Sequence, residues 1–277
     1  MLYRLAWDGC AVALRCDDRR LVDAVENYLD LAAEAIDDDP AATPAADVAR
    51  NGEGHRVRLA YGETATASPS ETVYLVLEAV AYGFAMATRQ LVVHAGGFVA
   101  AGGAVVCLGA PKAGKSSLSF AAWRRGFDVL GDDRICLDPA AGRASVYPKC
   151  LKIRLDGGAP PADMGDLVKQ GNAFVGALGD DRRLVLSRRL PGFAGYDAAP
   201  PLRALVCIER SDEAASRLEP VPVVEALDDI LGHAMLGDRT PMALVRLVKA
   251  HAPGGRLPRL KIAPDDTDAA LDLLREL

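Results

Sequence analysis

The sequence lacks clustered cysteine and histidine residues. Its six cysteines are scattered at positions 10, 16, 107, 136, 150 and 207, and no two of them form a C-x-x-C pair. A structural zinc module needs such spacing, so none is expected. Cys107, Cys136 and Cys207 stand inside apolar runs and are expected to behave as small core residues. This use of cysteine favours a reduced, cytosolic setting.

An excess of basic residues is also missing. The chain has 32 Lys and Arg against 38 Asp and Glu, a formal net charge of −6. General binders of nucleic acid or of anionic membranes depend on a basic surface, so neither partner is expected. The first ten residues, MLYRLAWDGC, show no charged start followed by the apolar segment of a secretion signal. We therefore expect a cytoplasmic protein.

No apolar run has the character of a membrane span. Residues 91–111 contain no Asp, Glu, Lys or Arg, but they include His94 and the glycine pairs at 96–97 and 102–103. A hairpin of two buried strands, 91–99 and 104–108, explains this stretch better than a helix in lipid. Half of the 277 residues are hydrophobic, which is enough for one large domain or two small ones.

The most informative stretch runs from residue 104 to residue 133. Its centre, GAPKAGKS, matches the phosphate-binding pattern G-x-x-x-x-G-K-[ST]. A short apolar strand precedes it, and a helix over 116–125, ended by Gly126, is predicted after it, as the motif requires. In such a loop Lys115 reaches the β and γ phosphates and Ser116 holds Mg²⁺, so ATP and Mg²⁺ are the expected cofactors. The residues expected to surround the nucleotide phosphates are Gly109, Ala110, Pro111, Lys112, Ala113, Gly114, Lys115, Ser116 and Ser117.

Two adjacent carboxylates, Asp132 and Asp133, follow the next predicted strand, 127–130. A pair of aspartates by itself usually marks a solvated turn. Directly after a phosphate loop, its helix and a strand, the pair is expected to lie near the phosphates. One carboxylate can then bind Mg²⁺, and the other can accept a proton from an attacking hydroxyl.

The order of these motifs resembles the HPr kinase/phosphorylase family and its smaller related kinases, including those of lasso-peptide clusters. The matching residues are His94-Ala95 before the hairpin turn, GAPKAGKSS at the loop and RRGFDVLGDD after the helix. The resemblance implies that Asp132 is the catalytic base, that Asp133 with Ser116 holds Mg²⁺, and that His94 sits beside the base. HPr kinases themselves are hexamers, so a homo-oligomer is expected from the resemblance alone.

Several cations downstream are candidates for substrate or phosphate contacts, although charged strand edges are common. They are Lys149, Lys152, Arg154, Arg188 and Arg189. In the family proper, a glutamate of an E-x-R-G segment also binds metal. The nearest equivalent here is Leu151-Lys152-Ile153-Arg154, which has a lysine in its place. This departure argues against a third metal carboxylate and against phosphorylase activity.

These observations predict an α/β fold. We expect a mixed-sheet P-loop kinase core of the HPr kinase C-terminal type at residues 89–277, and a small α+β region at residues 1–88 for packing or for substrate or partner binding. The expected activity is ATP- and Mg²⁺-dependent phosphorylation of a hydroxyl, first of a serine in a peptide or protein. Alternatives are a metabolite kinase, for example of the shikimate or gluconate type, and a nucleotide-binding sensor or scaffold without phosphotransfer.

Overall fold

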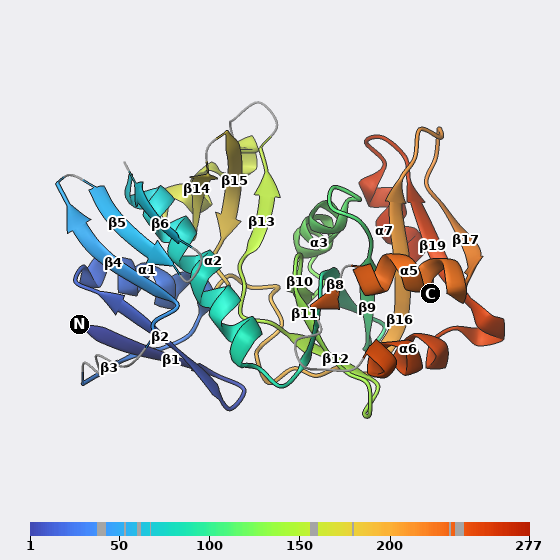
Figure 1. Cartoon of the computed structure of the whole chain (residues 1–277). Helices are drawn as coiled ribbons and strands as arrows, with labels where there is room; N and C mark the ends of the chain where they lie inside the picture. Colours follow the sequence, from blue (N-terminus) through green and yellow to red (C-terminus); the bar gives the residue numbers. More distant parts are fainter. Residues whose placement is uncertain are drawn as a thin grey trace. The chain divides into compact units, whose positions relative to one another are not determined.

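The computed structural model shows a mixed α/β fold in which the chain forms two compact units (Figure 1). The first unit consists of Met1–Arg89 and Pro148–Pro191, and the second of Gln90–Tyr147 and Gly192–Leu277. The structure describes residues 1–37, 43–52, 54–59, 62–66, 68–155, 160–178, 180–232, 234–235 and 241–277.

A six-stranded sheet forms one layer of the first unit, in the order β3-β1-β2-β4-β5-β6. Only β2 and β4 pair in parallel among these neighbours. The turn between β1 and β2 uses Asp8 and Gly9, both with positive φ, as a tight hairpin requires. The strands are β1 (Leu2–Trp7), β2 (Cys10–Cys16), β3 (Ala33–Ile36), β4 (Ala46–Asn51), β5 (Gly54–Leu59) and β6 (Gly62–Thr66).

The helices that pack near this sheet are α1 (Arg19–Leu29) and α2 (Pro69–Ala87). The side chain of Asp18 caps α1, and that of Ser68 caps α2. Helix α2 is apolar almost all round and is buried along most of its length. It lies between two sheets, touching β2 and β5 on one side and β14 (Ala173–Leu178) on the other (Figure 1). This double cover explains why the helix has so little polar surface.

The second sheet of the first unit comes from the segment that follows residue 147. Its strands β13 (Leu151–Arg154), β15 (Asp181–Leu186) and β14 pair antiparallel in that order, next to η1 (Ala162–Met164) and α4 (Gly165–Lys169). The expected division assigned residues 148–191 to the second domain. In the structure they belong to the first unit, because β14 covers the face of α2 that the six-stranded sheet leaves open.

The second unit has a six-stranded and a four-stranded sheet, ordered β10-β8-β9-β16-β19-β17 and β12-β11-β7-β18. In the larger sheet β9, β16 and β19 are parallel, and the other neighbours are antiparallel. Its strands are β8 (Ala95–Ala100), β9 (Gly103–Leu108), β10 (Val129–Gly131), β16 (Leu202–Arg210), β17 (Arg217–Pro222) and β19 (Arg256–Ile262). Those of the smaller sheet are β7 (Leu91–Val93), β11 (Ile135–Asp138), β12 (Arg143–Val146) and β18 (Ala234–Met235).

Helices cover the larger sheet. The predicted helix after the phosphate-binding pattern is confirmed as α3 (Lys115–Arg124), and it packs on β8 and on α7 (Thr267–Glu276). Alternate residues of β9, Ala104, Val106 and Leu108, belong instead to a core shared with the smaller sheet, α5 (Val223–Gly232) and α6 (Pro241–Ala250). A short turn, η2 (Pro253–Gly255), leads into β19. No helix in the described part of the chain is long and apolar enough to cross a membrane.

The single strand predicted over 91–99 is wrong in one respect. The structure divides it into β7 and β8, which belong to different sheets, and the break falls at His94. The neighbouring segment is interrupted in the same way between β10 and β11, at residues 132–134. Strand β8 pairs with β10, and β7 pairs with β11. The two segments therefore run side by side as they pass from one sheet to the other. This crossing places His94 and the two aspartates at one point.

Candidate functional site

The phosphate-binding pattern forms the expected loop between a parallel strand, β9, and the start of α3. Gly114 is the residue before the helix and has φ 111°, a conformation that favours glycine. At Gly109 a Cβ atom would lie 2.4 Å from the carbonyl oxygen of Ile208, so only glycine fits there. Lys112 has φ 69°, a strained value for a residue with a side chain. The loop therefore keeps its shape through tight backbone packing against β16.

Lys115, the first residue of α3, is folded back over the loop. Its side chain is buried, and its Nζ donates hydrogen bonds to the carbonyl oxygens of Gly109, at 2.7 Å, and Ala110, at 3.0 Å. Burial lowers the pKa of Lys115, and the negative charges of Asp133 and Asp132 oppose that shift. The ammonium group and the two carboxylates thus share one electrostatic environment inside the second unit.

The aspartate pair lies in the bend between β10 and β11. Asp132 is only 3 % exposed, whereas Asp133 is partly exposed. The Oδ1 atom of Asp133 lies 3.5 Å from Nδ1 of His94. Since the expected neighbour of His94 was Asp132, its role in orienting that residue stays a prediction.

Helix α3 holds this bend from the other side. The buried hydroxyl of Ser119 donates to the carbonyl oxygen of Gly131 at 2.9 Å. A Cβ atom on Gly96 would lie 2.8 Å from the same Ser119 oxygen, so β8 approaches the helix closely here. The phosphate loop and the aspartates are therefore linked through one turn of α3. Ser119 did not stand out in the sequence, because its role depends on contacts between elements.

A pocket that sequence reasoning missed lies beside the loop, and its lining includes both arginine and glutamate. It has a volume of about 350 Å³ and includes backbone of the loop together with the ends of β16 and β19. Arg210, the last residue of β16, extends its Nη2 to 3.4 Å from the hydroxyl of Ser117. Arg259 lines the same pocket. The sequence shows that Arg210 follows an apolar run, but only the structure shows that this run pairs with β9 and so brings its carboxyl end to the loop.

The five downstream cations lie in the first unit. Lys149, Lys152 and Arg188 are buried, and the two lysines both pair with Glu78 of α2, Lys149 at 3.1 Å. An Nη1 atom of Arg188 donates to the carbonyl oxygen of Lys149 at 3.4 Å. Arg154 pairs with Asp181, and Arg189 pairs with Asp30 on the surface. The proposed contacts of all five with substrate or phosphate stay predictions.

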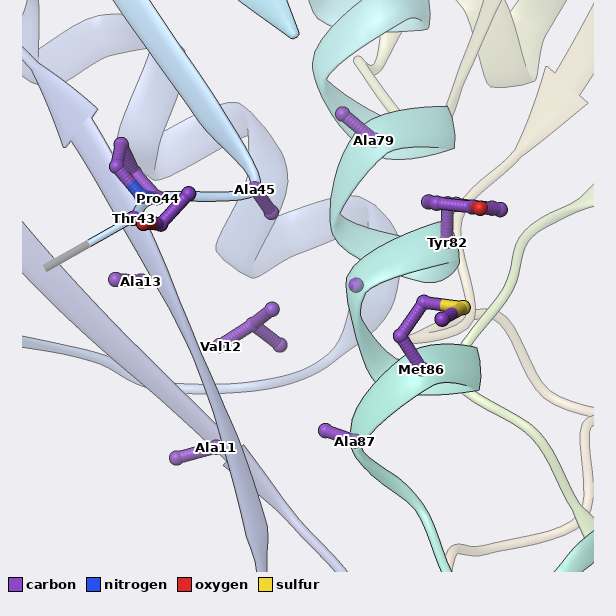
Figure 2. Close-up of a pocket in the computed structure, with 11 residues that line it drawn as sticks. Ala11, Val12, Ala13, Thr43, Pro44, Ala45, Ala79, Tyr82, Met86 and Ala87 are labelled. Atoms are coloured by element: carbon purple, nitrogen blue, oxygen red, sulfur yellow. The ribbon is translucent and has the colours of Figure 1, made fainter. Parts of the chain in front are cut away.

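A second hollow, in the first unit, has different chemistry. It measures about 330 Å³ and is formed by β2, the residues before β4 and one face of α2 (Figure 2). Its labelled side chains are small or apolar apart from Thr43 and Tyr82, and they include no carboxylate, imidazole or cation.

Comparisons with known proteins give little further guidance. No family model and no curated protein matches the sequence. Among solved structures, the HPr(Ser) kinase/phosphatase from Coxiella burnetii matches with 14% identity and a TM-score of 0.32, covering 67% of this chain and 94% of that one. At this identity and TM-score the likeness establishes neither a shared architecture nor a shared activity.

Proposed function

We propose that the chain is a kinase that uses ATP and Mg²⁺ to phosphorylate a hydroxyl, with a serine of a peptide or protein as the acceptor. The observation that carries the proposal is a phosphate-binding loop that is linked, through one turn of α3, to a bend that carries two carboxylates of the same unit. A loop alone would support nucleotide binding. A buried aspartate beside it also supports proton removal from an acceptor.

In this proposal the chain mainly positions the reactants. The backbone from Gly109 to Ser117 and the ammonium group of Lys115 bind the β and γ phosphates. Asp132 accepts the proton of the acceptor hydroxyl as that oxygen attacks the γ phosphorus. His94, 3.5 Å from Asp133, keeps that carboxylate in place. Little covalent chemistry is left for the protein, because charge stabilisation and alignment account for most of the rate in such transfers.

The residues present fit a magnesium ion better than a permanent metal centre. The described residues contain no group of three His, Cys, Asp or Glu side chains that could hold a metal by themselves. Mg²⁺ in kinases is usually bound by one or two protein oxygens together with phosphates and water. Ser116 and Asp133 supply such oxygens, and the ion would neutralise charge on the phosphates.

A labelling experiment tests this proposal and identifies the acceptor. Extract of the host cell is incubated with γ-labelled ATP, Mg²⁺ and the protein, and is then separated by size. We expect a labelled peptide or protein that is absent with Lys115→Ala. Label only in the small-molecule fraction would indicate a metabolite kinase instead. Tight ATP binding without any transfer would favour a sensor or scaffold.

The Asp132→Asn variant separates catalysis from binding. Because the amide has nearly the shape of the carboxylate but cannot accept the proton, we expect turnover to fall by about 10²- to 10⁴-fold. ATP affinity, measured by titration calorimetry, is expected to change little. Unchanged transfer in Asp132→Asn would show that the base has been assigned to the wrong residue.

A further inference from the structure

Arg134, the residue after the two aspartates, has a buried hydrogen-bond donor that the fold does not use. Its Nη1 atom is buried and has no hydrogen-bond acceptor in the part of the chain that the structure describes. Buried donors are nearly always satisfied, so an exception next to a candidate active site needs an explanation. A buried donor without an acceptor costs free energy, and that free energy is regained when a ligand supplies the acceptor.

The position of the guanidinium group is determined by its neighbours. Its central carbon lies over the ring of Tyr147 at 5.7 Å from the ring centre, a cation–π contact that limits its movement. Tyr147 is fully buried, so it provides a firm support. An arginine held in this way is preorganised, and little side-chain entropy remains to be lost when it binds an anion.

Strand register places this arginine beside His94. Ile135 of β11 pairs with Val93 of β7 and with Val146 of β12, both antiparallel. Arg134 comes just before Ile135, His94 just after Val93 and Tyr147 just after Val146, so all three adjoin this end of the smaller sheet. The same end leads into the bend that carries Asp132 and Asp133.

From this placement we infer that Arg134 binds an oxygen of the γ-phosphoryl group during transfer. The inference rests on the proposed kinase function. In that step the acceptor oxygen forms a bond to the γ phosphorus, the bond to the β–γ bridging oxygen breaks, and the acceptor proton goes to Asp132. The electron pair of the broken bond stays on the leaving nucleoside diphosphate. Arg134 donates hydrogen bonds to the transferring group, whose bound oxygens need donors as it passes between the two partners.

Transition-state analogue binding tests the inference without knowledge of the acceptor. Affinities for Mg·ADP and for Mg·ADP with aluminium fluoride are measured by calorimetry for wild type, Arg134→Gln and Arg134→Lys. We expect Arg134→Gln to weaken the fluoride complex about 10²- to 10³-fold and to leave ADP binding within about twofold. Lysine, which lacks the planar fork, is expected to restore only part of the loss. The control is Arg143→Gln at the far end of the β11–β12 hairpin, which should affect neither complex.

The possible results separate this inference from the proposed function. Equal loss of both complexes in Arg134→Gln, or loss of neither, would overturn the role of Arg134. Recovery of fluoride-complex affinity in Arg134→Gly on addition of free guanidinium, at a concentration that leaves the wild type folded by circular dichroism, would support it. Failure of the wild type itself to bind Mg·ADP would instead overturn the kinase proposal, and the arginine role with it.

Discussion

Single residues of the phosphate loop owe their roles to contacts across the sheet. Gly109 is required because the backbone of Ile208 leaves no room for a side chain. Lys115 is held by two carbonyl oxygens of its own loop. The motif predicted the roles of both residues, because the pattern G-x-x-x-x-G-K-[ST] specifies a glycine and a lysine at these positions. It could not predict Arg210, which reaches the loop from a strand about a hundred positions further along the chain.

Arg210 is expected to strengthen nucleotide binding. Its guanidinium lies 3.4 Å from the hydroxyl of Ser117, at the exposed end of β16 beside the phosphate loop. Because the group is exposed, Arg210→Gln should weaken ATP binding only about 2- to 10-fold, as for one modest charge-assisted hydrogen bond. The loss should shrink as salt is raised. Titration calorimetry with Arg256→Gln, at the opposite end of β19, as the control would measure it. Equal effects of both variants would argue for general charge instead of a local contact.

At the scale of elements, two features depend on close approach between secondary structures. The segments β7–β8 and β10–β11 pass between the smaller sheet and the larger one next to each other, and this brings His94 close to Asp133. In the first unit α2 crosses β2 at Gly83, where a Cβ atom would lie 2.3 Å from Cγ1 of Val12. Sequence periodicity predicts that a helix is buried, but not which residue of it meets which strand.

Gly83→Ala is expected to destabilise the protein even though alanine favours helix. Overpacking against the stiff side chain of Val12 costs about 1–3 kcal/mol, which exceeds the gain of about 1 kcal/mol in helix propensity. Urea unfolding of Gly83→Ala, Val12→Ala and the double variant would measure the effect. In the Val12→Ala background the glycine substitution should cost less, since the 2.3 Å clash is removed and the contact with Cβ of Ala45, at 3.0 Å, is the tightest that remains. An equal cost in both backgrounds would contradict the contact.

At the scale of the whole molecule, the chain assembles two units from interleaved segments. Residues 148–191 leave the second unit, complete the first, and return. All three catalytic candidates, His94, Lys115 and Asp132, belong to the second unit. The five downstream cations belong to the first. Nucleotide binding should therefore slow backbone hydrogen exchange mainly in the second unit.

Hydrogen exchange with mass spectrometry would detect this. Saturating Mg·ATP should slow exchange most in residues 109–124 and 129–135, because phosphate contacts order the loop, the start of α3 and the aspartate bend. A ligand at 100 times its Kd stabilises the bound state by about 2.7 kcal/mol. Helix α2, in the other unit, should show smaller changes. The pattern should vanish in Lys115→Ala. Uniform protection of the chain, or protection that persists in that variant, would contradict the assignment of the loop.

Elements with local causes could be predicted from the amino-acid sequence. The phosphate loop, its strand and its helix follow from neighbouring residues, because turn geometry and hydrophobic periodicity act over a few positions. Three features depend on the folded chain: the strand break at His94, the position of the Arg134 guanidinium over Tyr147, and the place of residues 148–191 in the first unit. These depend on strand register and on which face of an element finds a partner, and both are set by pairings between segments far apart in the chain.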